Sequence, residues 1–344
     1  MSRRGRPRTI RLSDPTDGGA RMVPQDSALV ILVRLVDRLP EPPPRRRRGR
    51  PRRYSDRLFL KALVIMVLKH LPKVHTLLEV LDEPAMRPVR ELLTEGGRYP
   101  ARRTWERRLQ AVPDGLPARI GCLGRCLVER LDPWGEPGRA AAIDSTVLRA
   151  LGGVWHRKHR EAGAVPHTSI DTEAHRTKSG WHGWVYGWKL HLVTTVADVW
   201  IPLAAELTPA NAADNEVAPR LLPELPPELP FLLGDTGYDD TELRERCADE
   251  GRELVTSRRG RYPHADGGVE VRRTFHGLRS KAIENFNGQF KAIFDCSGQV
   301  PTRGLVAPRR YVLGAVFVYQ LTLVHRHERH ADLRVGLKPF LKAA

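Results

Sequence analysis

The sequence has few cysteines and no long apolar run. Four cysteines in 344 residues are too few and too scattered for a disulfide framework, and no second cysteine pair lies near Cys122 and Cys126 to complete a zinc site. No stretch approaches the roughly 18 uninterrupted apolar residues of a membrane-spanning helix. The basic N-terminus also lacks an apolar secretory segment. We therefore expect a cytoplasmic protein that does not enter a membrane.

Acidic residues are also in deficit. Lys and Arg number 57 against 40 Asp and Glu, which gives a formal net charge of +17 and a pI near 10.3. Such an excess favours a polyanionic partner, and Arg suits bidentate contacts with phosphate. The apolar fraction of 41% is enough to bury a core. The length favours two domains over a single large one.

The chain divides where its composition changes. Residues 1–26 are rich in Arg, Gly and Pro and predict a flexible basic arm. Helical patterns fill residues 27–135 and are interrupted by a basic, proline-rich linker at 40–53. Strand and helix patterns then alternate over residues 138–330, and a C-terminal tail follows at 331–344. We therefore predict an all-α, helix-turn-helix-like DNA-binding domain followed by an α/β domain.

Two basic features of the helical domain are candidate DNA contacts. Arg-Gly-Arg-Pro-Arg occurs at residues 4–8 and again at 48–52, and this sequence is typical both of minor-groove contacts and of ordinary basic linkers. The candidates in the second copy are Arg48, Arg50 and Arg52. A helix predicted over 102–111 follows a short helix and a Gly-Gly turn, which is the layout of a helix-turn-helix. Its candidates are Arg102, Arg103, Thr104, Arg107 and Arg108.

A simpler interpretation of the second feature remains open. A basic, solvated helix with Trp105 and Leu109 facing a core would explain the same residues equally well.

Two aspartates end buried strands of the α/β domain. Asp144 ends the apolar run of AAAIDST, and Asp235 ends that of PFLLGDTGY. The order of elements is that of a ribonuclease H-like mixed sheet flanked by helices. If its first and fourth strands are neighbours, both carboxylates lie at one edge of the sheet. A third acid, Glu284, lies in the helix SKAIENFNGQFKAIF, whose apolar residues predict packing on the sheet, although a surface ion pair is the ordinary role of such a residue.

Three carboxylates without a histidine or cysteine ligand set favour Mg²⁺ or Mn²⁺. Two such ions about 3.5–4 Å apart would activate a water or a sugar hydroxyl and stabilise the departing oxygen of a phosphodiester. The chemistry implied is phosphoryl transfer on nucleic acid. The expected catalytic residues and metal ligands are Asp144, Asp235 and Glu284.

The segment from 155 to 191 is rich in histidine but lacks the spacing of a zinc site. We expect a basic, DNA-facing loop there, with Arg157, Lys158, Arg160, Arg176 and Lys178. Three tryptophans lie nearby, of which at most one stacks on a base while the others pack in the core: Trp181, Trp184 and Trp188. Lys189 and His191 alternate with leucines on the next strand and could border the acids, and Lys189 is a further candidate DNA contact.

Four sequence blocks carry a resemblance to a known family. IDST, YGWKLHL, GDTGYDD and IENFNGQFK resemble those of bacterial insertion-sequence DDE transposases, over roughly residues 138–327. The resemblance implies that the helical domain binds terminal inverted repeats and that the second domain hydrolyses a phosphodiester and transfers the freed 3′-hydroxyl to target DNA. It implies double-stranded DNA as both element end and target, a homodimer holding two ends, and association with the nucleoid.

Many members of the family share a signature of Tyr, two residues, Arg, three residues, Glu, six residues and Lys. Glu284 and Lys291 keep the Glu-to-Lys spacing, so the resemblance implies that Glu284 is the third acid. Gly277 and Ser280 occupy the Tyr and Arg positions. The resemblance therefore leaves open which nearby base contacts the terminal phosphates, and the candidates are Arg279, Lys281 and Lys291.

Two other functions fit the residues. A nuclease of the same fold would cut DNA without joining strands, and trapped joined products would distinguish it from a transposase. A non-catalytic DNA-binding protein would use the three acids structurally, and its titration with Mn²⁺ would show no binding.

Overall fold

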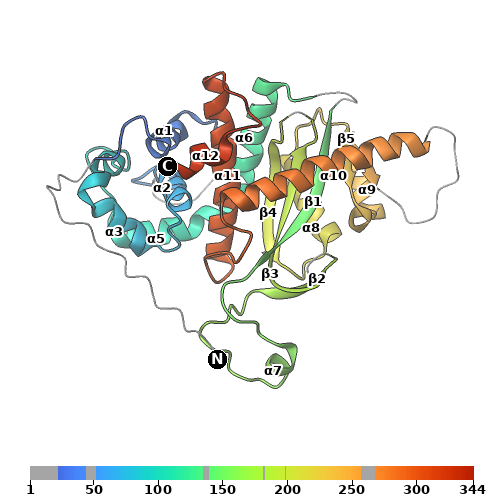
Figure 1. Cartoon of the computed structure of the whole chain (residues 1–344), viewed down its shortest axis with the longest axis horizontal. Helices are drawn as coiled ribbons and strands as arrows, with labels where there is room; N and C mark the ends of the chain where they lie inside the picture. Colours follow the sequence, from blue (N-terminus) through green and yellow to red (C-terminus); the bar gives the residue numbers. More distant parts are fainter. Residues whose placement is uncertain (1–21, 44–51, 135–138, 181–182, 198, 257–267) are drawn as a thin grey trace, which may run out of the picture.

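The structure is a computed structural model that describes residues 22–43, 52–134, 139–180, 183–197, 199–256 and 268–344. Helices of the N-terminal part lie beside a half that contains the sheet, and one long helix, α10, crosses that sheet (Figure 1). The first Arg-Gly-Arg-Pro-Arg copy, together with Arg48 and Arg50 of the second, lies outside the described residues. Their predicted DNA contacts therefore stay predictions.

The N-terminal half consists of short helices that surround an apolar centre. Ser27 and Ser55 cap the first two, because each hydroxyl accepts a hydrogen bond from the backbone N–H three residues later. The second helix buries most of its residues and forms the middle of this half. The helices are α1 (Ala28–Leu35), α2 (Asp56–Leu68), α3 (Val74–Asp82), α4 (Arg87–Glu91), α5 (Arg102–Ala111) and α6 (Leu116–Leu131). The helix predicted over 102–111 has the same bounds as α5.

The second half contains a six-stranded mixed sheet within the described residues. Its strands are β1 (Ala140–Arg149), β2 (His175–Ser179), β3 (Gly183–Thr195), β4 (Pro202–Pro209), β5 (Phe231–Gly234) and β6 (Glu253–Thr256). Strands β1, β3 and β4 pair antiparallel, whereas β1, β5 and β6 pair parallel. The order β4-β3-β1-β5-β6 is that of ribonuclease H-like domains. The predicted fold class is confirmed. The strands that end near Asp144 and Asp235 are β1 and β5, and they are neighbours, which is the condition for both carboxylates to lie at one edge.

Strand β3 is long enough to hold two neighbours on one side. Its residues 183–187 pair with β2, and residues 188–194 pair with β4. Strand β2 therefore forms a hairpin with the first residues of β3 and lies in line with β4. This hairpin is at the end of the sheet that β5 does not reach. This part of the chain was expected as a loop. Its residues HRTKS have no apolar alternation, so the strand is recognisable only from its pairing with β3.

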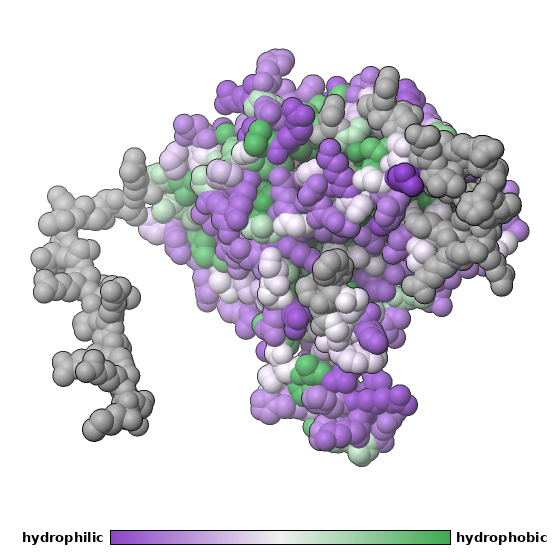
Figure 2. Space-filling model, turned by 45° about the vertical axis from the view of Figure 1, so that its right-hand side comes forward, coloured by the Kyte–Doolittle hydropathy of each residue, from purple (hydrophilic) through white to green (hydrophobic). Residues whose placement is uncertain are grey.

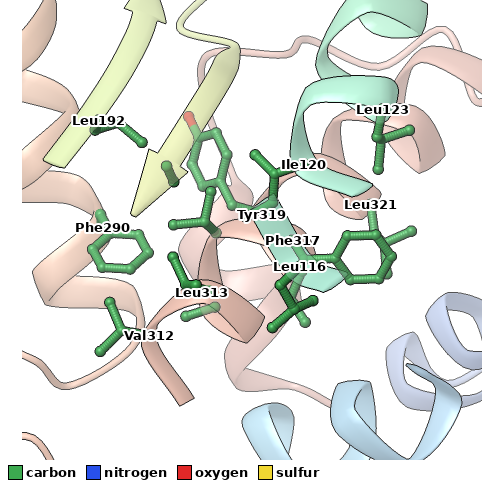
Figure 3. Close-up of a cluster of buried hydrophobic side chains, with 14 of the residues drawn as sticks. Leu116, Ile120, Leu123, Leu192, Phe290, Val312, Leu313, Phe317, Tyr319 and Leu321 are labelled. Carbon is green, nitrogen blue, oxygen red and sulfur yellow. The ribbon is translucent and has the colours of Figure 1, made fainter. Parts of the chain in front are cut away.

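Helices cover the sheet and join it to the N-terminal half. They are α7 (Arg157–Glu161), α8 (Asp214–Leu221), α9 (Thr241–Asp249), α10 (Gly268–Ile293), α11 (Val306–Glu328) and α12 (Leu337–Lys342). Helix α10 packs on β1, β3 and β5, while α6 and α11 pack on β4. Side chains of α6, α10, α11 and β3 meet in one cluster (Figure 3). A Cβ added to Gly124 of α6 would lie 2.7 Å from the Pro202 carbonyl oxygen, so this approach requires glycine.

The helical region and the sheet share one core, because α11 packs on α1 and α2 as well as on β4. Helix α10 begins at Gly268 and not at Ser280 as predicted, since Phe275 and Leu278 continue its apolar spacing. The segment expected as a tail contains α12. No helix within the described ranges is long and apolar enough to span a lipid bilayer.

Candidate active site

Asp144 and Asp235 come from adjacent parallel strands. Strands β1 and β5 pair in register from Ala140 with Phe231 onward, and both aspartates lie just beyond the last pair. Asp235 directly follows β5, and its Oδ1 accepts a hydrogen bond from the Gly237 N–H at 2.8 Å, capping the short helix η5 (Thr236–Tyr238). Asp144 lies within β1. The structure therefore brings these two carboxylates to one edge of the sheet.

The environment of Asp144 penalises its negative charge. Burial raises the pKa of this carboxyl to about 6, the backbone N–H of Ser145 opposes the shift, and the charges of Asp235 and Asp214 add to it. The side chain is 23% exposed, and the Arg279 Nη1 lies 4.0 Å from its Oδ2. A further cation at this edge would stabilise the ionised carboxylate.

Helix α10 supplies the cations nearest to Asp144. Arg279 is largely buried and directed at the Asp144 carboxylate. Lys291 lies three turns further along the helix; burial lowers its pKa, and the charges of Cys296 and Asp144 oppose that shift. Lys281, the third predicted phosphate contact on this helix, is exposed. Of the three, Arg279 is in closest contact with the carboxylates.

Glu284 is exposed on α10, and its Oε1 accepts a hydrogen bond from the Ser280 hydroxyl at 2.6 Å. In the part of the chain that the structure describes, no three His, Cys, Asp or Glu side chains converge closely enough to hold a metal ion. The structure thus joins Asp144 with Asp235 but leaves Glu284 apart from them.

A third aspartate, Asp214, approaches the same edge and was not anticipated. Lys189 on β3 donates hydrogen bonds to the Asp214 Oδ1 at 3.1 Å and to the Ala212 carbonyl oxygen at 2.9 Å. The Nδ1 of His191 lies 3.4 Å from the same carboxylate oxygen. Burial lowers the pKa of His191 to about 4, so this imidazole is neutral at pH 7. Lys189, predicted as a DNA contact, is therefore buried against Asp214.

Asp214 and Asp235 border the same glycine. A Cβ on Gly237 would lie 3.0 Å from the Asp235 Oδ1 and 3.8 Å from the Asp214 Oδ2. The charge of Asp214 also helps to raise the pKa of Tyr238, although burial is the main cause. An aspartate at the first residue of a helix is ordinarily a capping or dipole residue. Nothing in the local sequence distinguishes Asp214 from such a residue, and only the packing of α8 on β3 places it at this edge of the sheet.

The predicted contacts of the helical domain differ in exposure. Arg103 and Arg107 are exposed on α5, and Thr104 is half-buried. Arg102 pairs with Glu106 at 2.9 Å. Arg52 and Arg108 both pair with Asp56, and Arg108 also lies over the Phe59 ring, 4.2 Å from its centroid. Trp105 and Leu109 are fully buried, as the simpler interpretation of this helix required.

Residues 135–319 match the family described as Transposase DDE domain, which is more than half of the chain. The chain belongs to this family. The resemblance carried by its four sequence blocks is confirmed. DDE transposases generally use divalent metal ions, and Asp144 and Asp235 offer the oxygen ligands that such ions prefer.

The chain is also similar to solved structures at low identity. The piggyBac transposase synaptic complex with hairpin DNA is 9% identical, with coverage of 91% of this chain and 75% of that chain and a TM-score of 0.39. A pre-cleavage Mos1 transpososome is 12% identical, with coverage of 81% and 80% and a TM-score of 0.19. With scores this low, the assignment rests on the family match and on the strand order. No curated protein matches the chain.

Proposed function

We propose that this member of the Transposase DDE family is a DNA transposase that binds the inverted repeats of an insertion sequence, hydrolyses a phosphodiester at each end and joins the freed 3′-hydroxyl to target DNA. The observation that supports this most is the pair Asp144 and Asp235 on adjacent parallel strands, with Arg279 beside them. The carboxylates of this site would bind metal ions, and its buried cations would bind the negatively charged phosphodiester.

The carboxylates fit Mg²⁺ or Mn²⁺ as ligands, because both aspartates are oxygen donors and burial raises the pKa of Asp144 to about 6. Asp144 and Asp235 would hold two such ions. When bound, the pair supplies positive charge for the attacking and the leaving oxygen of the phosphodiester. Arg279 binds a phosphate oxygen beside Asp144, and Lys281 and Lys291 contact the flanking phosphates.

Glu284 completes the site when DNA binds. It shares a helix face with Lys291, seven residues later, and Lys291 is close enough to Asp144 for their charges to interact. This interaction between Lys291 and Asp144 is the observation that supports recruitment of Glu284 from the same helix face. Recruitment requires the bond from Ser280 to break and the Glu284 side chain, or α10 itself, to shift toward the sheet.

The helical domain is the proposed reader of the element ends. Arg103 and Arg107 are exposed on α5, and the two Arg-Gly-Arg-Pro-Arg segments act as tethers along the minor groove. The piggyBac and Mos1 structures are described as synaptic and paired-end complexes. A homodimer would likewise hold two ends of double-stranded DNA, in the cytoplasm and associated with the nucleoid.

The experiment is cleavage and strand transfer by the purified protein on DNA that carries the inverted repeats flanking its gene. Asp144→Asn and Asp235→Asn should each abolish both products and weaken Mn²⁺ binding in a calorimetric titration. Asp249→Asn, an exposed acid on α9, is the matched control. Cleavage without joined product would indicate a nuclease, and full activity of both variants would contradict the proposed site.

A further inference from the structure

A projecting arm extends the sheet beyond the aspartates. It comprises residues 150–180 and 183–187, which include α7, β2 and the beginning of β3, and it stands out from the body of the molecule (Figure 1). Its surface is mostly hydrophilic (Figure 2). Strand β1 leads into this arm directly from Asp144, so the arm continues the edge at which the candidate active site lies.

One face of the arm combines cations with an exposed indole. Lys178 lies opposite Trp184 in the pairing of β2 with β3, and Arg176 lies two residues before Lys178. Cross-strand partners and alternate residues share a face of a sheet, so these three side chains stand together. Trp184 is 69% exposed, whereas Trp188, four residues later on the same strand, is fully buried. Trp184 therefore contributes little to the core.

Helix α7 adds a third cation to this face. The Arg176 Nη2 lies 2.9 Å from the Nδ1 of His156, which directly precedes α7. Burial and the charge of Arg160 together lower the pKa of His175 on β2. The charge of Arg160 also acts on Tyr186, the partner of Arg176. Arg176 and Lys178 on β2 thus lie beside the exposed indole, and Arg160 is close enough to Tyr186, two residues after Trp184, for its charge to act there.

The acids of the arm face elsewhere and anchor it. Asp171 accepts a hydrogen bond from the Gly304 N–H at 2.9 Å, and Glu173 accepts one from the Leu305 N–H at 2.8 Å. Glu161 pairs with Arg157 on α7. The arm is therefore held against the connection between α10 and α11, and the face with Trp184 keeps its positive charge.

We propose that this face binds single-stranded DNA leaving the active site, with one unpaired base stacked on Trp184 and phosphates against Arg160, Arg176 and Lys178. A duplex conceals its base faces, whereas a single strand offers them to an exposed indole among cations. Leu192 lies opposite Asp144, and Trp184 lies about eight residues along β3, or about 26 Å at 3.3 Å per residue. That span holds at most about eight nucleotides, counted at the 3.4 Å rise of a stacked strand in a duplex, and fewer if the single strand is extended. The inference rests on the proposed function.

The test compares binding of the full chain to two DNAs of arbitrary sequence by fluorescence anisotropy. One is a blunt duplex, and the other is the same duplex with a single-stranded overhang of about 12 nucleotides. Trp184→Ala should weaken binding to the overhang DNA by about five- to 150-fold and leave the blunt duplex nearly unchanged. Trp184→Phe should retain most of the wild-type affinity for the overhang DNA, because its ring can still stack on a base.

The three cations have a different expected signature. Arg160→Gln, Arg176→Gln and Lys178→Gln should each reduce the slope of log affinity against log salt on the overhang DNA by about 0.7. Lys338→Gln, an exposed cation on α12, is the control and should leave that slope unchanged.

Three results would overturn the inference. The first is that Trp184→Ala weakens binding to both DNAs equally, and the second is that it weakens binding to neither. The third is that Trp184→Ala changes the oligomeric state in size-exclusion chromatography but not DNA binding, which would make this face a contact between protein chains. Failure of the wild-type chain to bind either DNA would instead contradict the proposed function.

Discussion

The edge of the sheet and the surface of α10 contribute to the proposed site in different ways. Asp144 and Asp235 are positioned by the backbone register of paired strands, and Asp144 is largely buried. Glu284 is exposed on a helix and accepts a hydrogen bond from Ser280. The fold therefore places two carboxylates together before any ligand arrives, whereas under the proposed function the third joins them only when ligands bind. In that proposal the cost of bringing like charges together is deferred until cations are present.

The largest effect should separate catalysis from folding. Glu284→Gln should lower single-turnover DNA cleavage by about 10³-fold, since several kcal/mol of charge stabilisation depend on a complete ligand set. The free energy of unfolding without metal should change by less than about 0.5 kcal/mol, because the side chain is exposed. Cleavage assays and denaturant titration measure the two quantities. Glu129→Gln on α6 is a helix-surface control, and cleavage by Glu284→Gln at the wild-type rate would remove Glu284 from the site.

A smaller loss should follow from Lys189→Met. This substitution leaves the Asp214 carboxylate without its ammonium partner beside Asp144 and Asp235. Loss of a residue that orients an active-site carboxylate typically costs about 10–100-fold in metal affinity or activity. We expect cleavage to require correspondingly more Mn²⁺, and the double variant with Asp214→Asn to recover part of the loss. A changed salt slope of DNA binding with unchanged Mn²⁺ dependence would instead show that Lys189 contacts phosphate.

The same contrast explains how much the sequence could predict. Apolar runs that end in aspartate predicted both strands and their shared edge, because strand pairing leaves little freedom to residues at strand ends. The spacing from Glu284 to Lys291 identified Glu284 as the candidate third acid on a helix. It could not predict where the Glu284 carboxylate points, because the direction of a long side chain on a helix surface depends on its ligands. The ion pair of Lys189 with Asp214 depends on where α8 packs, which no local pattern encodes. Strand β2 was missed because its residues are polar and only pairing defines it.

The smallest expected effect concerns the stability of the metal-free protein. The folded-state pKa of Asp144 is about 6, above its ordinary value of 3.8, so the ionised carboxylate destabilises the fold at pH 7 by about 3 kcal/mol. Asp144→Asn should therefore unfold at higher denaturant than the wild type at pH 7. The difference should shrink as the pH falls from 6 toward 4 and vanish near pH 3, below both pKa values, where the wild-type carboxyl is protonated in both states. Saturating Mn²⁺ should reverse the order, because the ion stabilises only the protein that binds it. Asp249→Asn, at an exposed position, should follow the wild type at every pH. A constant difference between wild type and Asp144→Asn from pH 4 to pH 7 would mean that the strand edge does not penalise the charge of Asp144, and the distinction between a preassembled, strained edge and an unstrained helix surface would fail.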